Sequence, residues 1–290
     1  MKNNMKTALL LGSLAGLMVF LGSMLGGRGG AVIGLVFAAV MNLGSYWFSD
    51  KIALKMSKAR PVTRTQAPEL YAAVYRLTQR AGMPMPSLHV IPSEQPNAFA
   101  TGRSPSQAAV AVTEGLLNIL GPDELDGVLA HELAHVRNRD ILIASVAATI
   151  AGAVSFVATM ARWGAMFGGG GGNNRDNPGG IFGILAASIV APIAAMIMQM
   201  AVSRSREFQA DALGAEIAGR PQGLASALRK LELMSQRVPM AVNPSAAPLF
   251  IVNPLGAWAK GASRMFSTHP PTEERIRRLD AIAARPGYLA

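Results

Sequence analysis

The chain of 290 residues contains no cysteine, few charged residues and few aromatic residues. The absence of cysteine excludes disulfide bonds and thiolate ligands, so a zinc site would have to use histidine and carboxylate side chains. Only 15% of the residues are charged and 50% are hydrophobic, with a mean hydropathy of +0.29. This composition favours a chain with membrane spans over a soluble one. The net charge is +10, but no compact basic stripe with interleaved aromatic residues is present, so we expect no nucleic-acid partner.

Histidine is also scarce, and two of the four histidines lie four residues apart in the motif HELAH, 131–135. On a helix, residues i and i+4 share one face. His131 and His135 can therefore offer two imidazole ligands to one zinc ion, and Glu132 can act as a base toward water. The alternative is a chance pair of surface histidines, which the accompanying glutamate argues against. We interpret His89, which lies in an apolar run, as structural.

Four apolar stretches predict a mainly α-helical membrane protein in contact with the lipid bilayer. Residues 7–27 carry no charge and reach the ~20 residues that a bilayer core requires. Residues 29–48 follow at once, so we interpret the first stretch as an uncleaved anchor and not as a signal peptide. Residues 141–167 and 180–203 are the third and fourth predicted spans. Long helices buried in a soluble protein are the alternative.

The distribution of basic residues predicts the orientation of these spans. Lysine and arginine gather on one side of the predicted membrane, at Lys2, Lys6, Lys51, Lys55, Lys58, Arg60, Arg64, Arg204 and Arg206. The other side holds only Arg28 and Arg175 between consecutive spans. Because cytoplasmic loops carry the excess of positive charge, we expect both termini and the 49–140 region to be cytoplasmic. The glycine-rich stretch 168–180 would then be an exterior loop.

Outside the spans, the sequence predicts a cytoplasmic α+β domain with a small sheet. The expected helices are 66–82, 121–140, 204–236 with a break near 219–221, and 268–283. Short β-like runs occur at 87–92, 97–102 and 108–115. The helix over 121–140 could continue into the third span.

These elements divide the chain into four parts. Residues 1–48 form an N-terminal transmembrane hairpin, and 49–140 form a cytoplasmic part with the HELAH helix. Residues 141–203 form a second transmembrane hairpin, and 204–290 form a cytoplasmic part with the remaining metal ligand.

The stretch SREFQAD, 205–211, is the best candidate for that ligand. Glu207 and Asp211 lie one turn apart on one helix face, and two intervening spans return the chain to the side of the histidines. We predict that Glu207 binds the metal and that Asp211 orients a ligand histidine. Asp140 is too close to the histidines on the same helix to close the site easily. The alternative is a surface helix in which both carboxylates are ordinary.

Together, HELAHVRNRD, SREFQADALGAEIAG, PNAFATG and FSTHPPTEERI resemble the HtpX-type membrane zinc metalloproteases, gluzincins related to the CAAX-prenyl proteases. The resemblance covers nearly the whole chain. It implies an endopeptidase of the bacterial inner membrane with one Zn²⁺ per chain, which cleaves misfolded or damaged membrane proteins from the cytoplasmic side. The positions that match the family's functional residues are the ligands His131, His135 and Glu207, the general base Glu132 and the orienting carboxylate Asp211.

Three further residues are candidates for contact with a peptide substrate. His269 is a candidate catalytic donor to a developing oxyanion, or a ligand that shields the resting metal, and a packing role is the alternative. Arg275 is a second candidate donor. The run 97–102 could form an exposed strand that pairs with an extended peptide, with Asn97 contacting the peptide backbone, and a plain loop is the alternative.

Two other functions compete with a peptidase. A non-proteolytic membrane scaffold or chaperone could hold a structural zinc ion, but such a site needs no base at Glu132. A transporter or channel would carry ionisable residues inside its spans, and these spans are nearly free of them. We therefore expect protein or peptide substrates, membrane proteins above all.

Overall fold

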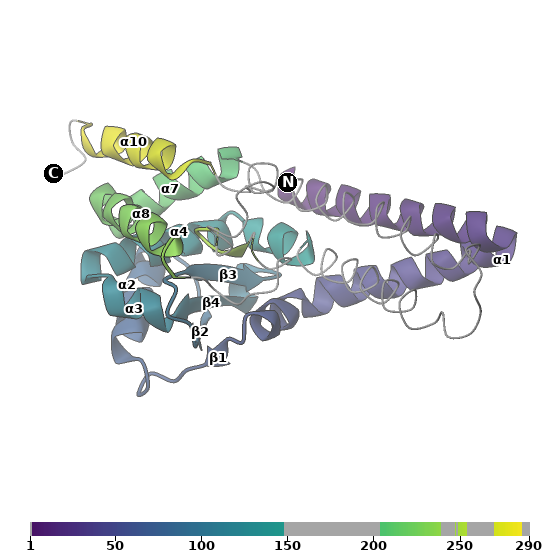
Figure 1. The fold of residues 1–290 in the computed structure, drawn as a ribbon, viewed down its shortest axis with the longest axis horizontal. Helices are drawn as coiled ribbons and strands as arrows, with labels where there is room; N and C mark the ends of the chain where they lie inside the picture. The colour runs from purple at the N-terminus through teal and green to yellow at the C-terminus, as the bar shows by residue number, and fades with distance from the viewer. Residues whose placement is uncertain (1, 148–203, 239–246, 248, 254–269, 286–290) are drawn as a thin grey trace, which may run out of the picture.

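The computed structural model describes residues 2–147, 204–238, 247, 249–253 and 270–285. Figure 1 shows a long helical arm on one side and a domain of helices around a small sheet on the other. The predicted spans 141–167 and 180–203 lie outside the described residues, apart from a helical stretch over 141–147.

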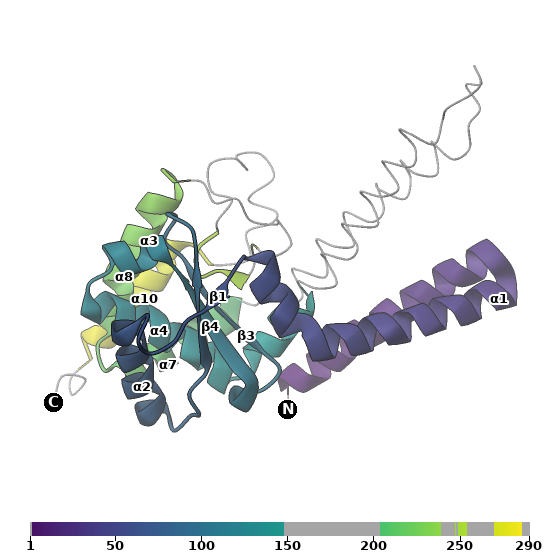
Figure 2. The same cartoon turned by 90° about the horizontal axis from the view of Figure 1, so that it is seen from below.

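The arm is helix α1, Lys2–Met56, which folds back on itself. The reversal occurs at Gly27, whose φ of 57° is a left-handed value that glycine adopts without strain. Figure 2 shows the two halves of α1 side by side, and Asn42 Nδ2 of one half donates to the carbonyl of Leu11 in the other at 3.0 Å. The stretches predicted as 7–27 and 29–48 therefore form the two halves of a helical hairpin.

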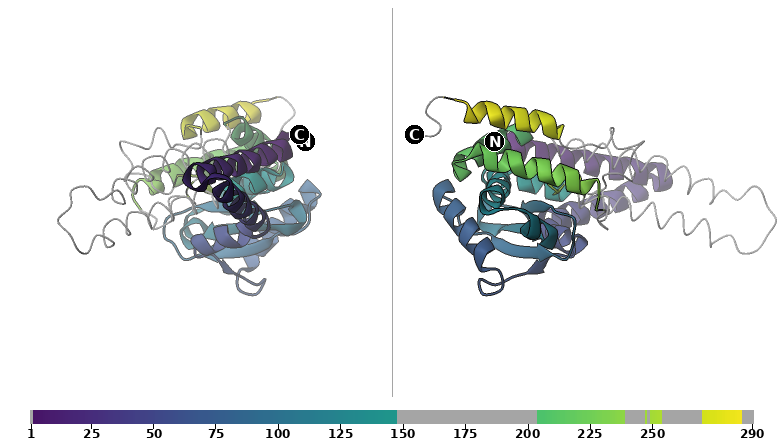
Figure 3. Two further views of the ribbon diagram at one scale, coloured as in Figure 1. Left: turned by 90° about the vertical axis from the view of Figure 1, so that its right-hand side faces the viewer. Right: turned by 60° about the vertical axis from the view of Figure 1, so that its left-hand side comes forward.

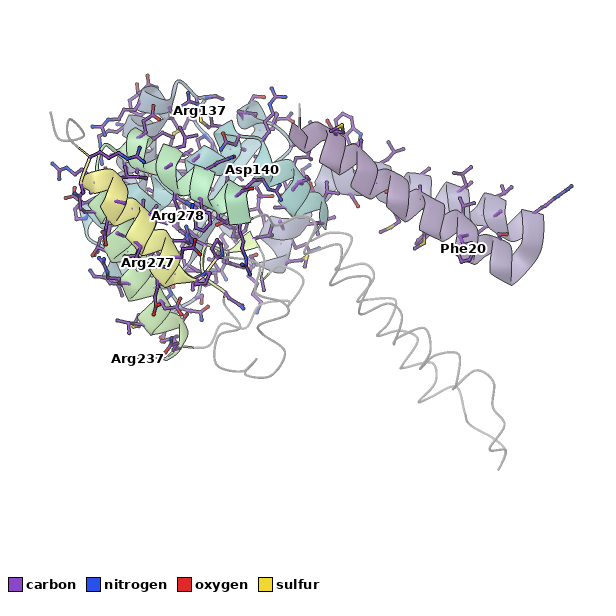
Figure 4. The ribbon with its side chains drawn as sticks, turned by 90° about the horizontal axis from the view of Figure 1, so that it is seen from above. Phe20, Arg137, Asp140, Arg237, Arg277 and Arg278 are labelled. Atoms are coloured by element: carbon purple, nitrogen blue, oxygen red, sulfur yellow. The ribbon has the colours of Figure 1, made fainter. Side chains whose placement is uncertain are left out.

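The second half of α1 has an apolar surface of membrane length. Among the described residues, Gly27–Met56 is the one helix long and apolar enough to cross a bilayer. Its large apolar side chains point outward, with Ile33 71% and Val40 64% exposed. Phe20, labelled in Figure 4 on the first half, is 60% exposed. Contiguous apolar surface of this kind is unusual in a soluble monomer and marks contact with lipid or another protein.

The sheet contains four strands in the order β1-β2-β4-β3. The bounds are β1 Arg60–Pro61, β2 Ser87–Ile91, β3 Ala98–Gly102 and β4 Ala108–Thr113. β2 pairs with β4 in parallel, whereas the β1–β2 and β3–β4 pairs are antiparallel. The three predicted β-like runs are confirmed as strands. β1 was not predicted, because two residues, one of them proline, are too short to show a period.

The helices around the sheet follow the predicted pattern except at Glu114–Ile119, a helix that was not predicted and whose first two residues fall in the predicted β-like run 108–115. They are α2 Pro68–Ala81, α3 Glu114–Ile119, α4 Pro122–Arg137, α7 Arg204–Ala218, α8 Pro221–Ser235 and α10 Thr272–Ala283, with a short 3-10 turn at Pro105–Gln107. α2 ends at Gly82, which adopts a left-handed conformation. One expectation is wrong: α4 does not continue into the third span. Asn138 and Arg139 form a turn, with Arg139 at φ 59°, and helix resumes at residue 140.

The core places α4 at the centre of the domain. Successive residues of β4 face opposite sides of the sheet, so Val110 and Val112 pack toward α4 while Ala111 packs toward the end of α1. On that second side, the rings of Phe99 and Phe250 pack edge to face, with their centroids 5.1 Å apart. Figure 3 shows α8 and α10 over α4 on the side away from the sheet. α4 is thus covered from both sides, and its residues His131 and Glu132 are enclosed.

Candidate metal centre

Helix α4 carries the HELAH motif into the interior. Its first turn is fixed by Glu124, whose Oε2 accepts the amide proton of Gly121 at 2.9 Å, as in a capping interaction. Two turns later, His131 is 1% and Glu132 is 3% exposed. Burial of a histidine and a glutamate side by side is costly unless both have partners. The arrangement is therefore typical of a functional site.

Helix α7 reaches this site because a glycine allows it to touch the α4 backbone. A Cβ at Gly214 would lie 2.9 Å from both the Cα and the N of His131, closer than real Cβ contacts allow. The absence of a side chain at this position lets α7 approach α4 closely enough for Glu207 and Asp211 to reach the histidines. Gly214 was not among the residues predicted from the sequence, although it follows Asp211 by three positions on the same helix.

The potential ligand atoms of His131, His135 and Glu207 converge. The two Nε2 atoms lie 3.2 Å apart. Glu207 Oε1 is 3.5 Å from His135 Nε2, and Oε2 is 3.8 Å from His131 Nε2. Zinc bonds of ~2.0–2.1 Å at tetrahedral angles place ligand atoms about 3.3 Å apart. The donor set and its spacing therefore fit a zinc ion with three protein ligands.

Each histidine also meets a carboxylate on the other side of its ring. His131 Nδ1 lies 3.0 Å from Asp211 Oδ1, and His135 Nδ1 lies 3.1 Å from Asp140 Oδ2. A carboxylate at Nδ1 holds the proton there and leaves Nε2 free to bind a metal. Asp211 lies beside the Nδ1 side of His131, where a carboxylate that orients this ring is expected. From the sequence, Asp140 was considered only as a possible metal ligand. In the structure it contacts the Nδ1 side of His135, away from Nε2.

Arg275 of α10 completes the surroundings of Asp211. Its guanidinium binds both carboxylate oxygens, with Nη2 2.7 Å from Oδ1 and Nε 3.0 Å from Oδ2. Its Nη1 donates to the carbonyl of Ile251 at 3.3 Å, and the side chain is 1% exposed. Arg278, one turn on, stacks over Phe208 of α7 at 3.6 Å. These contacts hold α10 against the site.

The charges around the two histidines separate their pKa values. Burial and the positive charge of Arg275 lower the pKa of His131 to about 4. Burial also disfavours a proton on His135, but Glu207 and Asp140 outweigh it and raise the pKa to about 9. For Asp211, burial is outweighed by Arg275 and His131, and the pKa falls to about 2. Without a metal, one ligand histidine is therefore neutral and the other protonated near pH 7.

The side chain of Asn97 is enclosed by backbone groups. It is 0% exposed. Its Nδ2 donates to the carbonyl of Val252 at 2.8 Å, and its Oδ1 accepts from the amides of Ala98 and Val252. The run 97–102 does form a strand, β3, but the expectation that this strand is exposed is wrong, because all five of its residues are buried.

The remaining candidates lie apart from the ligand cluster or outside the described residues. His269 belongs to the stretch 254–269, which the structure does not describe. His89 is half-buried on β2, and burial lowers its pKa.

Comparison with known proteins also points to a metallopeptidase. The sequence pattern of peptidase family M48 matches residues 64–283. A protease HtpX homolog of Desulfatibacillum aliphaticivorans is 56% identical over 286 residues, covering 99% of this chain and 91% of the relative. A protease HtpX homolog of Persephonella marina is 55% identical over 294 residues, covering 99% of this chain and 100% of the relative.

The crystal structure of S. mikatae Ste24p shares the fold, with a TM-score of 0.52 at 22% identity. The match covers 96% of this chain and 66% of Ste24p. The family pattern, the HtpX relatives and the buried histidine–carboxylate cluster agree, and the chain belongs to peptidase family M48 as a metallopeptidase.

Proposed function

We propose that the chain is a zinc-dependent endopeptidase of the bacterial inner membrane, which cleaves misfolded or damaged membrane proteins from the cytoplasmic side. The observation that carries this proposal is the convergence of His131, His135 and Glu207 beside the buried Glu132. A structural zinc site would not need a carboxylate at Glu132. The HtpX name of the relatives adds support for the proteolytic reading over the scaffold or chaperone.

In this proposal each residue has a distinct task. A zinc ion at the three ligands would polarise the scissile carbonyl and favour ionisation of water near neutral pH. Glu132 takes the proton from the attacking water and returns it to the leaving amine nitrogen as the peptide bond breaks. It lies one residue from His131, about 100° around the helix, and so stands off the axis that the two ligand histidines share. Its negative charge nevertheless acts on His135 and favours a raised pKa there.

Two candidates from the sequence take revised roles. Arg275 binds Asp211 through both carboxylate oxygens, so we propose that it orients Asp211, with His269 as the candidate donor to the oxyanion. Asn97 joins β3 to the 249–253 segment. We propose that it shapes the site through this segment without touching the substrate.

Attachment to the membrane is proposed from the apolar surface of α1 and from the basic residues that follow it. We propose four spans, formed by 1–48 and 141–203, with the metal site and both termini in the cytoplasm. Single cysteines in this cysteine-free chain test the orientation. Lys55, exposed at the end of α1, should react as Lys55→Cys with an impermeant maleimide only after lysis. Asn173→Cys should react in intact cells, and the opposite pattern would invert the topology.

The function itself is tested with Glu132→Gln, assayed on an unfolded protein such as casein. We expect the variant to keep one zinc per chain and to lose proteolysis by at least ~10²-fold, because only the base is removed. Glu114→Gln, at an exposed position of α3, is the matched control and should cleave normally. Near-normal cleavage by Glu132→Gln would remove Glu132 as the base, and loss of zinc would assign it to the ligand set. A wild-type chain that binds zinc but cleaves nothing would support the scaffold or chaperone.

A further inference from the structure

Asp140 and Arg206 form a buried pair behind the metal ligand His135. Asp140 Oδ2 lies 3.1 Å from His135 Nδ1, and Asp140 Oδ1 lies 4.0 Å from Arg206 Nη1. Both side chains are enclosed, at 8% and 9% exposure. An arginine and an aspartate are rarely this buried unless each compensates the other. The pair is separate from the ligand atoms, since it meets His135 on the ring nitrogen that faces away from Glu207.

A turn in the backbone after α4 brings Asp140 to this position. α4 ends at Arg137, and the turn at Asn138 and Arg139 includes a left-handed residue, with Arg139 at φ 59°. This turn interrupts the helix immediately before Asp140, so Asp140 is not confined to the helical position that would follow His135 by five residues. Figure 4 places Asp140 on the half of the domain nearest α1.

Arg206 comes from a different part of the chain. It lies in the first turn of α7, immediately before the ligand Glu207. In the sequence, Asp140 therefore precedes the 148–203 segment and Arg206 follows it, and both belong to the described residues. Their contact joins the two ends of the second predicted hairpin at the metal site.

The same order of groups occurs on the other ligand histidine. There, Arg275 holds Asp211 and Asp211 holds His131, with contacts of 2.7 Å and 3.0 Å. On the His135 side the aspartate contact is of similar length, whereas the arginine contact is longer at 4.0 Å. Arg206 should therefore contribute less than Arg275 does.

We propose that Asp140 and Arg206 are positioning residues for the metal site, Asp140 holding the His135 ring and Arg206 holding Asp140. This inference rests on the proposed zinc site. It assigns the ends of the second predicted hairpin a part in building that site, in addition to anchoring the chain. A displacement that separated these ends would withdraw Asp140 from His135 and weaken metal binding.

A double-mutant cycle on the full-length chain in detergent tests the pair, with the zinc dissociation constant measured by competition with a chromophoric chelator. Asp140→Asn should weaken zinc binding about 10–100-fold, because the amide can donate to Nδ1 and place the imidazole proton on Nε2. Arg206→Met should weaken it by a smaller factor. The double variant should bind no more weakly than Asp140→Asn alone, because Arg206 acts only through Asp140.

Three further measurements separate positioning from general damage. Asp140→Glu and Arg206→Lys keep the charges and should recover part of the affinity. The visible absorption bands of the Co²⁺-substituted protein should shift in Asp140→Asn, since the ring of a ligand is displaced. The control is the ion pair between Asp123 and Arg220, whose charged atoms lie 2.8 Å apart and whose side chains are both 65% exposed. Asp123→Asn and Arg220→Met should leave zinc affinity and the Co²⁺ bands unchanged.

The inference is overturned if Asp140→Asn binds zinc within twofold of the wild type. It is also overturned if the losses from Asp140→Asn and Arg206→Met multiply independently, because Arg206 would then act by another route. A wild-type chain that binds no zinc would instead refute the proposed function on which the inference rests. The variants that keep the charges guard against a result caused only by misfolding.

Discussion

Helix α1 and the α4–α7 interior depart from an ordinary soluble protein in opposite directions. α1 exposes large apolar side chains, such as Ile33 at 71%. The interior encloses charged ones, with Glu132 3%, Glu207 5% and Asp211 2% exposed. Large apolar side chains are normally inside and carboxylates outside. Each reversal therefore indicates a partner, an apolar phase around α1 and a cation between α4 and α7.

The two regions also differ in how specifically their residues are required. Burying an ion costs several kcal/mol unless a partner compensates it, so each charge in the interior depends on a particular neighbour at a particular distance. In the proposed membrane setting, the outer surface of α1 needs only apolar character, because lipid contact is not directional. We therefore expect single conservative changes to matter greatly in the interior and little on α1, and each of the following measurements tests this contrast.

Glu207→Ala should produce the largest effect. It removes the proposed third metal ligand and leaves the Nε2 atoms of the two histidines facing each other at 3.2 Å. Zinc affinity and proteolysis should both fall by more than about 100-fold, beyond the range typical of residues that act behind a ligand. Glu216→Ala, at an exposed position of the same helix, is the control. Stoichiometric zinc in purified Glu207→Ala would remove Glu207 from the ligand set.

A charge on α1 should have the next largest effect, and on a different property. Val36 is 59% exposed and lies near the middle of the predicted span 29–48. Val36→Lys should disfavour membrane insertion by about 3 kcal/mol, whereas Val36→Leu should insert normally. The measurement is the fraction of chain recovered with membranes after carbonate extraction. Equal recovery of both variants would place this face of α1 against protein or water.

Asp211→Asn should weaken zinc binding about 10–100-fold while leaving the three ligands in place. It should also change the response to acid. Because the pKa of Asp211 is lowered to about 2 in the folded chain, its stabilising contribution is present above an unfolded pKa of about 3.9 and is lost as pH falls through 2. Thermal unfolding from pH 4 to pH 2 should thus drop more steeply in the wild type than in Asp211→Asn. Parallel curves would contradict the contact with Arg275.

The smallest expected effect is a tenfold step per pH unit in zinc affinity. The pKa of His135 is raised to about 9 and that of His131 lowered to about 4 in the metal-free chain. Between pH 6.5 and 8.5 only His135 must lose a proton to bind zinc, so affinity should rise about tenfold per pH unit. Proton release measured by calorimetry in two buffers should be close to one. A release near two would mean that both histidines are protonated before binding.

The parts of the site that the sequence predicted are those set by local periodicity. His131 and His135 share a helix face, and so do Glu207 and Asp211, so a regular helix alone brings each pair together. The positions of Asp140 and Asn97 could not be predicted in this way. Asp140 reaches His135 because Arg139 adopts a left-handed backbone conformation, which no periodic pattern indicates.

The fold likewise combines features that the local sequence predicts with features that it does not. The helices other than α3, and the three longer strands, follow from hydrophobic periods and from turn residues such as Gly82. The burial of Asn97 depends on contact with Val252, 155 residues away, and the approach of α7 depends on Gly214 lying against His131. Contacts between segments so distant in the chain leave no signature in the local sequence.

The central claim is that proteolysis requires a zinc ion held between α4 and α7. The most direct test removes the metal from the purified full-length chain with a chelator and then restores it, with cleavage of casein as the readout. We expect cleavage to disappear in the metal-free protein and to return when about one equivalent of Zn²⁺ is added, while Glu132→Gln takes up the same zinc and stays inactive. Full cleavage by the metal-free chain, or a purified chain that takes up no zinc, would contradict the account.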